Sequence, residues 1–137
     1  MPALDSYLFF DGTCAEAMRF YQAALGGKLD MMTYGQAPDP QQCPAGAKDL
    51  IMHASLAVDG RTLMASDTPP GQASPGMSGF SLSLAYPAAA DARRVFDQLA
   101  AGGKVTMPMN KTFWAEAFGM LTDRFGTPWM VMGGVSM

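Results

Sequence analysis

One short pattern occurs twice in the chain, and this repeat limits the possible folds more than any other feature. The first copy contains Phe20, Gln22, Ala24, Gly26, Gly27, Lys28 and Met31. The second contains, in the same order and spacing, Phe96, Gln98, Ala100, Gly102, Gly103, Lys104 and Met107. In both copies a helix-like stretch ends at a glycine pair and a strand-like stretch follows. The repeat therefore predicts two modules in which a helix, a glycine pair and a strand follow one another in the same order.

Apolar residues at helical spacing predict one helix in each copy, over about 14–25 and about 89–101. Thr13 and Glu16 match the T-x-x-E pattern of a capping box at the start of the first helix. The second helix has no equally good start signal. Each copy is therefore expected to place one amphipathic helix against a sheet.

Strand-like segments precede and follow each helix. We expect strands at 4–10, 29–34, 50–58 and 61–66, and again at 79–86, 104–107, 117–122 and 129–132. Asp59-Gly60 is a strong signal for a two-residue hairpin turn. The resulting order is βαβββ twice, which predicts a single α+β domain over residues 1–137. Module one covers about 1–66, a Pro- and Gly-rich linker about 67–78, and module two about 79–137.

Composition excludes several classes of partner. The net charge is −3 and the nine basic residues are scattered, so we expect no nucleic-acid and no membrane partner. The start of the chain lacks the basic flank of a signal peptide, and no apolar run approaches the roughly 20 residues of a transmembrane helix. We therefore expect a cytoplasmic protein, in which Cys14 and Cys43 are reduced thiols.

Several short motifs carry a family resemblance along almost the whole chain. They are Tyr7-Leu8-Phe9-Phe10-Asp11-Gly12, Glu16-Ala17-Met18, Phe20-Tyr21, Met52-His53-Ala54, Ser66-Asp67, Asp123-Arg124-Phe125-Gly126 and Trp129. With the paired βαβββ plan, they resemble the PhnB-like branch of the vicinal oxygen chelate superfamily, which includes glyoxalases, extradiol dioxygenases and bleomycin resistance proteins. The resemblance implies two curved mixed sheets around a shared cavity, and a homodimer.

Glyoxalase-like relatives hold a divalent metal through His and Glu side chains on the first and last strands of each module. The positions that align with these ligands are Ser6, Met64, Phe80 and Met130. None of them offers an imidazole or a carboxylate. We therefore expect no metal at this site and no cofactor.

The aligned strand positions, together with the places of His53, Trp114 and Glu116 in the predicted strands and loops, suggest which side chains line the cavity. The candidates are Ser6, Phe10, His53, Met64, Phe80, Trp114, Glu116, Met130 and Met132. Among them, His53 and Glu116 are the candidate catalytic groups. Asp67 and Asp123 lie beside turns, where capping and turn bonding explain them.

His53 is the only histidine, so any imidazole chemistry depends on it. A two-residue turn at Asp59-Gly60 would place His53 on the same strand face as Met64, whereas a slip of one residue would reverse this. A strand histidine can equally be satisfied by a carbonyl or by solvent. Glu116 could act as an acid or base, and the aromatic rings beside it, including Trp114, could hold a cationic ligand, although surface carboxylates are usually only solvated.

Three functions remain open. The favoured one is a metal-free small-molecule-binding protein, or an enzyme of unknown reaction. The second is a metal-dependent lyase, isomerase or dioxygenase that holds one divalent ion through His53 and Glu116. The third is a purely structural or interaction role for a paired-module dimer. A methyltransferase is not supported, because it would normally bind S-adenosylmethionine at a glycine-rich turn between a strand and a helix. No glycine pair in this sequence lies in such a turn.

Overall fold

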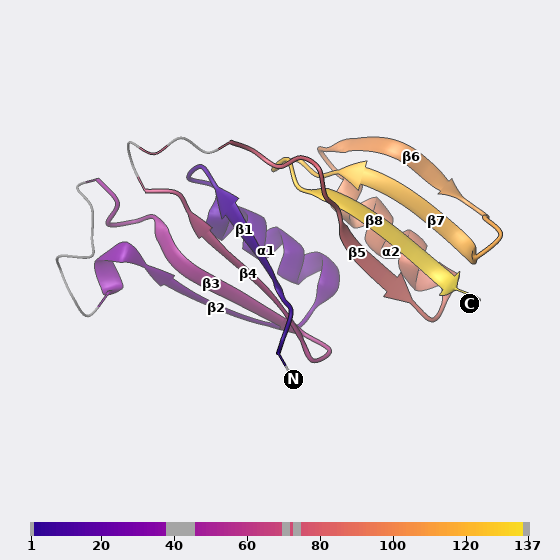
Figure 1. The fold of residues 1–137 in the computed structure, drawn as a ribbon, viewed down its shortest axis with the longest axis horizontal. Coiled ribbons are helices and arrows are strands. Elements are labelled where there is room, and N and C mark those ends of the chain that lie inside the picture. Colours follow the sequence, from indigo (N-terminus) through magenta and orange to yellow (C-terminus); the bar gives the residue numbers. More distant parts are fainter. Residues whose placement is uncertain (1, 38–45, 70–71, 73–74, 136–137) are drawn as a thin grey trace. The chain divides into compact units, whose positions relative to one another are not determined.

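A computed structural model describes residues 2–37, 46–69, 72 and 75–135. The chain divides into two compact units, Met1–Gly76 and Met77–Met137. Each unit is a βαβββ module with one helix and one four-stranded mixed sheet (Figure 1). The predicted α+β class and the repeated order are therefore confirmed. Cys43, the prolines at 38, 40 and 44, and part of the predicted linker lie outside the described residues.

The first unit contains β1 Ser6–Phe10, α1 Cys14–Leu25, β2 Lys28–Thr33, the 3₁₀ turn η1 Tyr34–Gln36, β3 Ile51–Val58 and β4 Arg61–Asp67. Its sheet has the order β1-β4-β3-β2, in which β1 and β4 are parallel and the other neighbours antiparallel. Val58 pairs with Arg61, and Asp59 and Gly60 both have positive φ. The predicted two-residue turn is therefore confirmed.

The second unit repeats this plan with β5 Leu82–Tyr86, α2 Ala89–Ala100, β6 Lys104–Asn110, β7 Ala115–Thr122 and β8 Pro128–Val135. The sheet order is β5-β8-β7-β6. β5 begins at Leu82, so Phe80 lies before the strand in which it was predicted. No helix among the described residues has the length and apolar character to cross a bilayer.

The start of α1 differs from the prediction. Thr13 makes no side-chain capping hydrogen bond, and its backbone (φ −108°, ψ 10°) lacks the extended conformation of an ordinary cap, so the predicted Thr13–Glu16 box is wrong. Instead, the Cys14 N–H donates to Asp67 Oδ1 over 2.9 Å. A buried carboxylate at the end of β4 thus binds the first turn of the helix.

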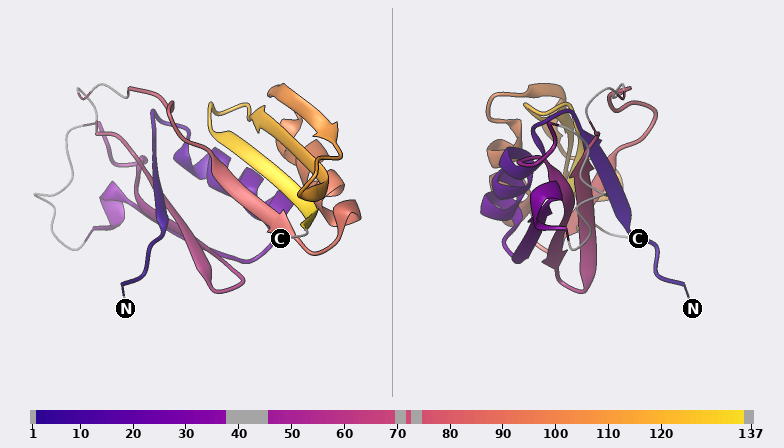
Figure 2. Two further views of the ribbon diagram at one scale, coloured as in Figure 1. Left: turned by 45° about the vertical axis from the view of Figure 1, so that its right-hand side comes forward. Right: turned by 90° about the vertical axis from the view of Figure 1, so that its left-hand side faces the viewer.

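Each helix covers one face of its own sheet (Figure 1, Figure 2). In the first unit, Leu8, Ala54 and Ala65 are paired across three strands and buried on the α1 side. In the second, a Cβ added to Gly133 would lie 2.7 Å from Ala92 Cβ of α2, which places Gly133 on the helix side. The opposite side of each sheet is called here the helix-free face.

The pairing registers give the equivalent positions of the two modules. Tyr7 pairs with Met64 and Met64 with Ser55, whereas Ser83 pairs with Met130 and Met130 with Met120. Met64 of β4 is therefore equivalent to Met130 of β8. Because side chains alternate along a strand, this equivalence identifies matching residues on both faces.

Candidate functional site

The helix-free face of the first sheet carries a row of aromatic rings. The Tyr7 ring lies 5.1 Å from Phe9 and 5.8 Å from His53, measured between ring centroids. Tyr7 Oη and His53 Nδ1 are 3.4 Å apart, within hydrogen-bonding distance. Phe9 is 54% exposed and Tyr7 38% exposed. The row is therefore accessible, and it combines apolar rings with two polar groups.

His53 lies on the side of β3 that the Asp59-Gly60 turn predicted. Ser55 pairs with Met64, and alternation puts His53 on the same face as both. Across the sheet, Met32 of β2 pairs with His53. His53 is exposed on this face, and its catalytic role stays a prediction.

Tyr34 places a third polar group near this row. Its hydroxyl donates to the Asp67 carbonyl oxygen over 3.4 Å. Burial raises the pKa of Tyr34, and the charges of Tyr7 and Asp67 raise it further. Because all three causes disfavour the phenolate, Tyr34 remains a neutral hydrogen-bond donor at physiological pH.

Asp67 organises the backbone beneath the row. It is 2% exposed; its Oδ1 accepts from the Cys14 N–H and its Oδ2 accepts from the Ile51 N–H over 2.9 Å. These bonds connect the ends of β4, α1 and β3. Asp67 therefore has the capping role expected from its position, and it holds the strand that carries His53.

The Cys14 thiol is chemically inert in this setting. Burial, and secondarily the Asp67 charge, raises the pKa of Cys14 to about 12. Thiolates are the reactive species, and this rise in pKa lowers the thiolate fraction at pH 8 about a thousandfold, so the folded protein should alkylate at Cys14 about a thousandfold more slowly than the unfolded chain. Iodoacetamide labelling of a Cys43→Ser variant, with and without urea, measures this difference. Native and unfolded rates within tenfold of each other would contradict it.

The helix-free face of the second sheet is rich in methionine. Met107, Met120 and Met130 are paired in a row across β6, β7 and β8, and Phe118 pairs with Met132 in the next row. The repeat predicted that Met107 would match Met31. A bulge between Val105 and Met107 instead moves Met107 onto the helix-free face.

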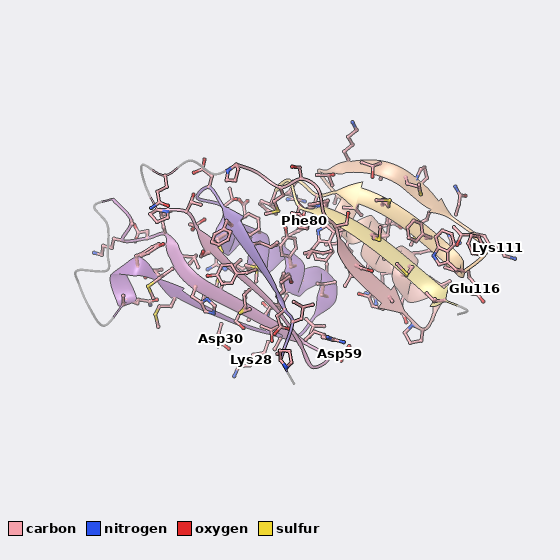
Figure 3. All side chains as sticks on the ribbon, viewed as in Figure 1. Lys28, Asp30, Asp59, Phe80, Lys111 and Glu116 are labelled. Carbon is pink, nitrogen blue, oxygen red and sulfur yellow. The ribbon has the colours of Figure 1, made fainter. Side chains whose placement is uncertain are left out.

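Aromatic side chains extend this surface toward the β6–β7 turn. Trp114 packs edge-on against Phe118 with ring centroids 5.3 Å apart, and Phe113 against Trp114 at 4.7 Å. Glu116 is exposed, and it lies with Lys111 at the end of the sheet where β6 leads into β7 (Figure 3). The acid, base or cation-binding role of Glu116 stays a prediction.

The predicted lining residues lie on different faces. Met64, Met130 and Met132 are on helix-free faces. Ser6 pairs with Leu63 on the α1 side, and Phe10 is buried there at 3% exposure. Tyr7 and Phe9 occupy the helix-free positions of β1, and sequence reasoning missed them together with Tyr34. Phe80 lies outside the sheet and is 44% exposed. The binding roles of the predicted residues, and the shared cavity, stay predictions.

The side chains at these positions do not fit a divalent metal. At the helix-free positions of the first and last strands of each module, the side chains include thioethers at Met64 and Met130, a phenol at Tyr7 and a hydroxyl at Ser83, and His53 of β3 adds one imidazole. Hard divalent ions prefer carboxylate and imidazole ligands, and a catalytic site usually needs about three. Within the described ranges no three His, Cys, Asp or Glu side chains are grouped to hold an ion.

Comparison with known proteins agrees with this fold. The model of the Glyoxalase/Bleomycin resistance protein/Dioxygenase superfamily matches residues 3–131. Protein YjdN of Escherichia coli is 41% identical over 93% of this chain and 92% of its own length.

Two solved structures have the same architecture. Protein PA1353 of Pseudomonas aeruginosa is 46% identical with a TM-score of 0.90, covering 97% of this chain and 98% of that one. The PhnB protein of Bacillus cereus is 23% identical with a TM-score of 0.77, covering 96% and 99%. The match with the superfamily over nearly the whole chain confirms the resemblance seen in the sequence. The chain belongs to the Glyoxalase/Bleomycin resistance protein/Dioxygenase superfamily.

Proposed function

We propose that this chain binds a small apolar or aromatic molecule without the divalent metal of glyoxalase-like relatives. One observation carries the proposal: the equivalent strands β4 and β8 place Met64 and Met130 on their helix-free faces. In the family resemblance, these strands supply metal ligands. A thioether is a poor ligand for hard divalent ions but packs well against flat or irregular apolar ligands.

The neighbouring side chains support an apolar ligand. Met120 and Met107 continue the row from Met130, and Phe118 pairs with Met132. Small-molecule sites are mostly apolar, with a few polar groups that fix orientation. His53 and Glu116 are the candidates for such groups. The superfamily name itself includes bleomycin resistance proteins beside enzymes, so binding without catalysis has a precedent at the level of the fold. The homodimer stays a prediction.

A thermal shift screen with small aromatic molecules tests the proposal. A molecule at a hundred times its Kd should stabilise the folded state by about 2.7 kcal/mol, which raises the Tm by several degrees. Met64→Asp tests the first sheet and Met130→Asp the second. The variant in the sheet that holds the ligand should abolish this shift, because it places a charge among apolar side chains. His53→Ala should weaken it. Met77→Gln, outside both sheets, is the matched control and should leave the shift unchanged.

Metal analysis separates this proposal from the metal-dependent alternative. Manganese, nickel, zinc and iron should neither raise the Tm nor remain bound in stoichiometric amounts after purification without chelator. One equivalent of bound metal, lost in His53→Ala, would instead favour a metal-dependent lyase, isomerase or dioxygenase.

A further inference from the structure

We propose that Tyr7, Tyr34 and His53 form the polar end of a binding site for a planar aromatic molecule that carries a carbonyl or carboxylate oxygen on its ring. This inference rests on the proposed function and adds the chemistry of the ligand. Phe9, Tyr7 and His53 supply adjacent aromatic surfaces, with interplanar angles of 37° and 38° between neighbours. A flat ligand can pack against such a row over a large area.

The hydrogen bonds indicate which ligand group the site prefers. A phenol is a good donor, and an imidazole nitrogen with a lone pair is a good acceptor. The Tyr7–His53 contact is compatible with either direction. In the arrangement that we propose, Tyr7 Oη donates to His53 Nδ1, and the ring carries its proton on Nε2, where it can donate to a ligand oxygen. The 3.4 Å separation is long, so Tyr7 can also turn its hydroxyl toward a ligand.

Tyr34 adds a second phenol, whose charge interacts with that of Tyr7. Its hydroxyl already donates to a carbonyl oxygen, and its neutral form is favoured. The Tyr7–His53 contact joins β1 to β3, and Tyr34 of η1 interacts electrostatically with Tyr7. His53 and Tyr7 can donate to a ligand, and Tyr34 can do so when its hydroxyl turns away from the Asp67 carbonyl oxygen, 3.4 Å distant. These donors favour a ligand with acceptor oxygens over a cation or a pure hydrocarbon.

The second unit provides an internal comparison. By register, Tyr7 is equivalent to Ser83, Phe9 to Ala85 and His53 to Phe118. On the helix side, Leu8 is matched by Leu84 and Leu56 by Leu121. The core positions have thus kept similar side chains, whereas these helix-free positions have diverged. A structural role common to both sheets does not account for the Tyr7–His53 pair.

The single histidine allows a direct test by NMR. Protein without a histidine tag gives one imidazole Cε1–H signal, which is followed during titration with benzoate, acetophenone and ethylbenzene. The last two probes are closely matched in shape, but only acetophenone has an acceptor oxygen. We expect benzoate or acetophenone to shift the imidazole signal and to bind about tenfold more tightly than ethylbenzene, as one net hydrogen bond allows.

Variants then assign the effect. Tyr7→Phe and Tyr34→Phe should each weaken binding of the oxygen-bearing probe by several fold, and His53→Phe by about tenfold. Because His53→Phe removes the only imidazole, its binding is followed on the NMR signals of the ligand instead. His53→Gln keeps an N–H donor and should retain more affinity than His53→Phe. Ala57→Ser, on the same face but about 13 Å along β3 from His53, is the control and should bind like wild type.

The outcomes distinguish the two proposals. Equal binding of all three probes, unchanged in every variant, would overturn the role of Tyr7, Tyr34 and His53 and leave the proposed apolar site standing. No binding of any aromatic probe, here and in the thermal shift screen, would overturn both. Circular dichroism and Tm measurements identify any variant whose loss of binding reflects loss of folding.

Discussion

Asp123→Ala should lower the free energy of unfolding of the second unit by about 4 kcal/mol, the largest stability effect that we expect. Asp123 is 3% exposed and accepts three hydrogen bonds. Its Oδ1 accepts from the Phe125 and Thr127 N–H groups at 2.9 and 3.0 Å, and its Oδ2 accepts from Trp129 Nε1 at 2.8 Å. Alanine would leave these donors without their acceptor, and each buried unsatisfied group costs about 1–3 kcal/mol.

Urea unfolding followed by tryptophan fluorescence measures this effect. Both tryptophans, Trp114 and Trp129, lie in the second unit, so the signal reports that unit. Asp123→Asn keeps one carbonyl oxygen and should cost about half as much. The matched control is Asp97→Ala, an exposed position on α2, which should change stability by less than about 0.5 kcal/mol. A loss below about 1 kcal/mol in Asp123→Ala would contradict the argument.

Asp123 also bears on binding. Trp129 precedes Met130 on β8, and the bond from its indole to Asp123 fixes the start of that strand. Because alternation is strict, a strand that slips by one residue would turn Met130 and Met132 toward the helix. We therefore expect the folded Asp123→Asn variant to bind ligand more weakly, although Asp123 itself does not contact the ligand.

The sequence predicted the parts of the site that depend on short-range signals. The repeat around the glycine pairs predicted both modules, and Asp59-Gly60 fixed the β3–β4 register. From that register, His53 and Met64 were correctly placed on one face. Turn chemistry and periodicity act within a few residues, so one sequence is enough to detect them.

The orientation of β1 could not be predicted in the same way. Tyr7, Leu8, Phe9 and Phe10 are all apolar or aromatic, so alternation gives no preferred inner face. The structure decides through tertiary packing: Leu8 and Phe10 are buried against α1, and Tyr7 and Phe9 lie on the helix-free face. The cap from Asp67 is likewise a tertiary feature, since it joins two residues 53 positions apart in the sequence. The Met107 bulge depends on how β6 pairs with the neighbouring strand β7, for which the sequence carries no turn signal as clear as Asp59-Gly60.

Gly103→Ala should destabilise the second unit by about 3 kcal/mol, because the second glycine of each pair is required for close backbone packing. A Cβ at Gly103 would overlap the Thr122 carbonyl oxygen and lie 2.8 Å from Asp123 Cα. At Gly27, the equivalent position, a Cβ would overlap the Ala57 carbonyl oxygen. Backbone atoms of a paired strand cannot move aside as a flexible side chain can, so the strands must separate.

Gly60→Ala separates this clash from backbone strain. Gly60 has a φ of 78°, and a methyl group added there would meet no other atom within 4 Å. Gly60→Ala should therefore lower the free energy of unfolding only by the backbone strain of an alanine in the left-handed conformation, about 1–2 kcal/mol. Gly103 has no such positive φ, so its larger loss would come from the clash alone. Because Gly60 lies in the first unit, which has no tryptophan, both losses are read by urea unfolding followed by circular dichroism. Equal losses would refute close packing as the cause. The glycine pair would then mark only the end of a helix. A larger loss at Gly103 would instead explain why both copies contain two glycines: the first turns the chain, and the second lets β2 or β6 approach its neighbouring strand.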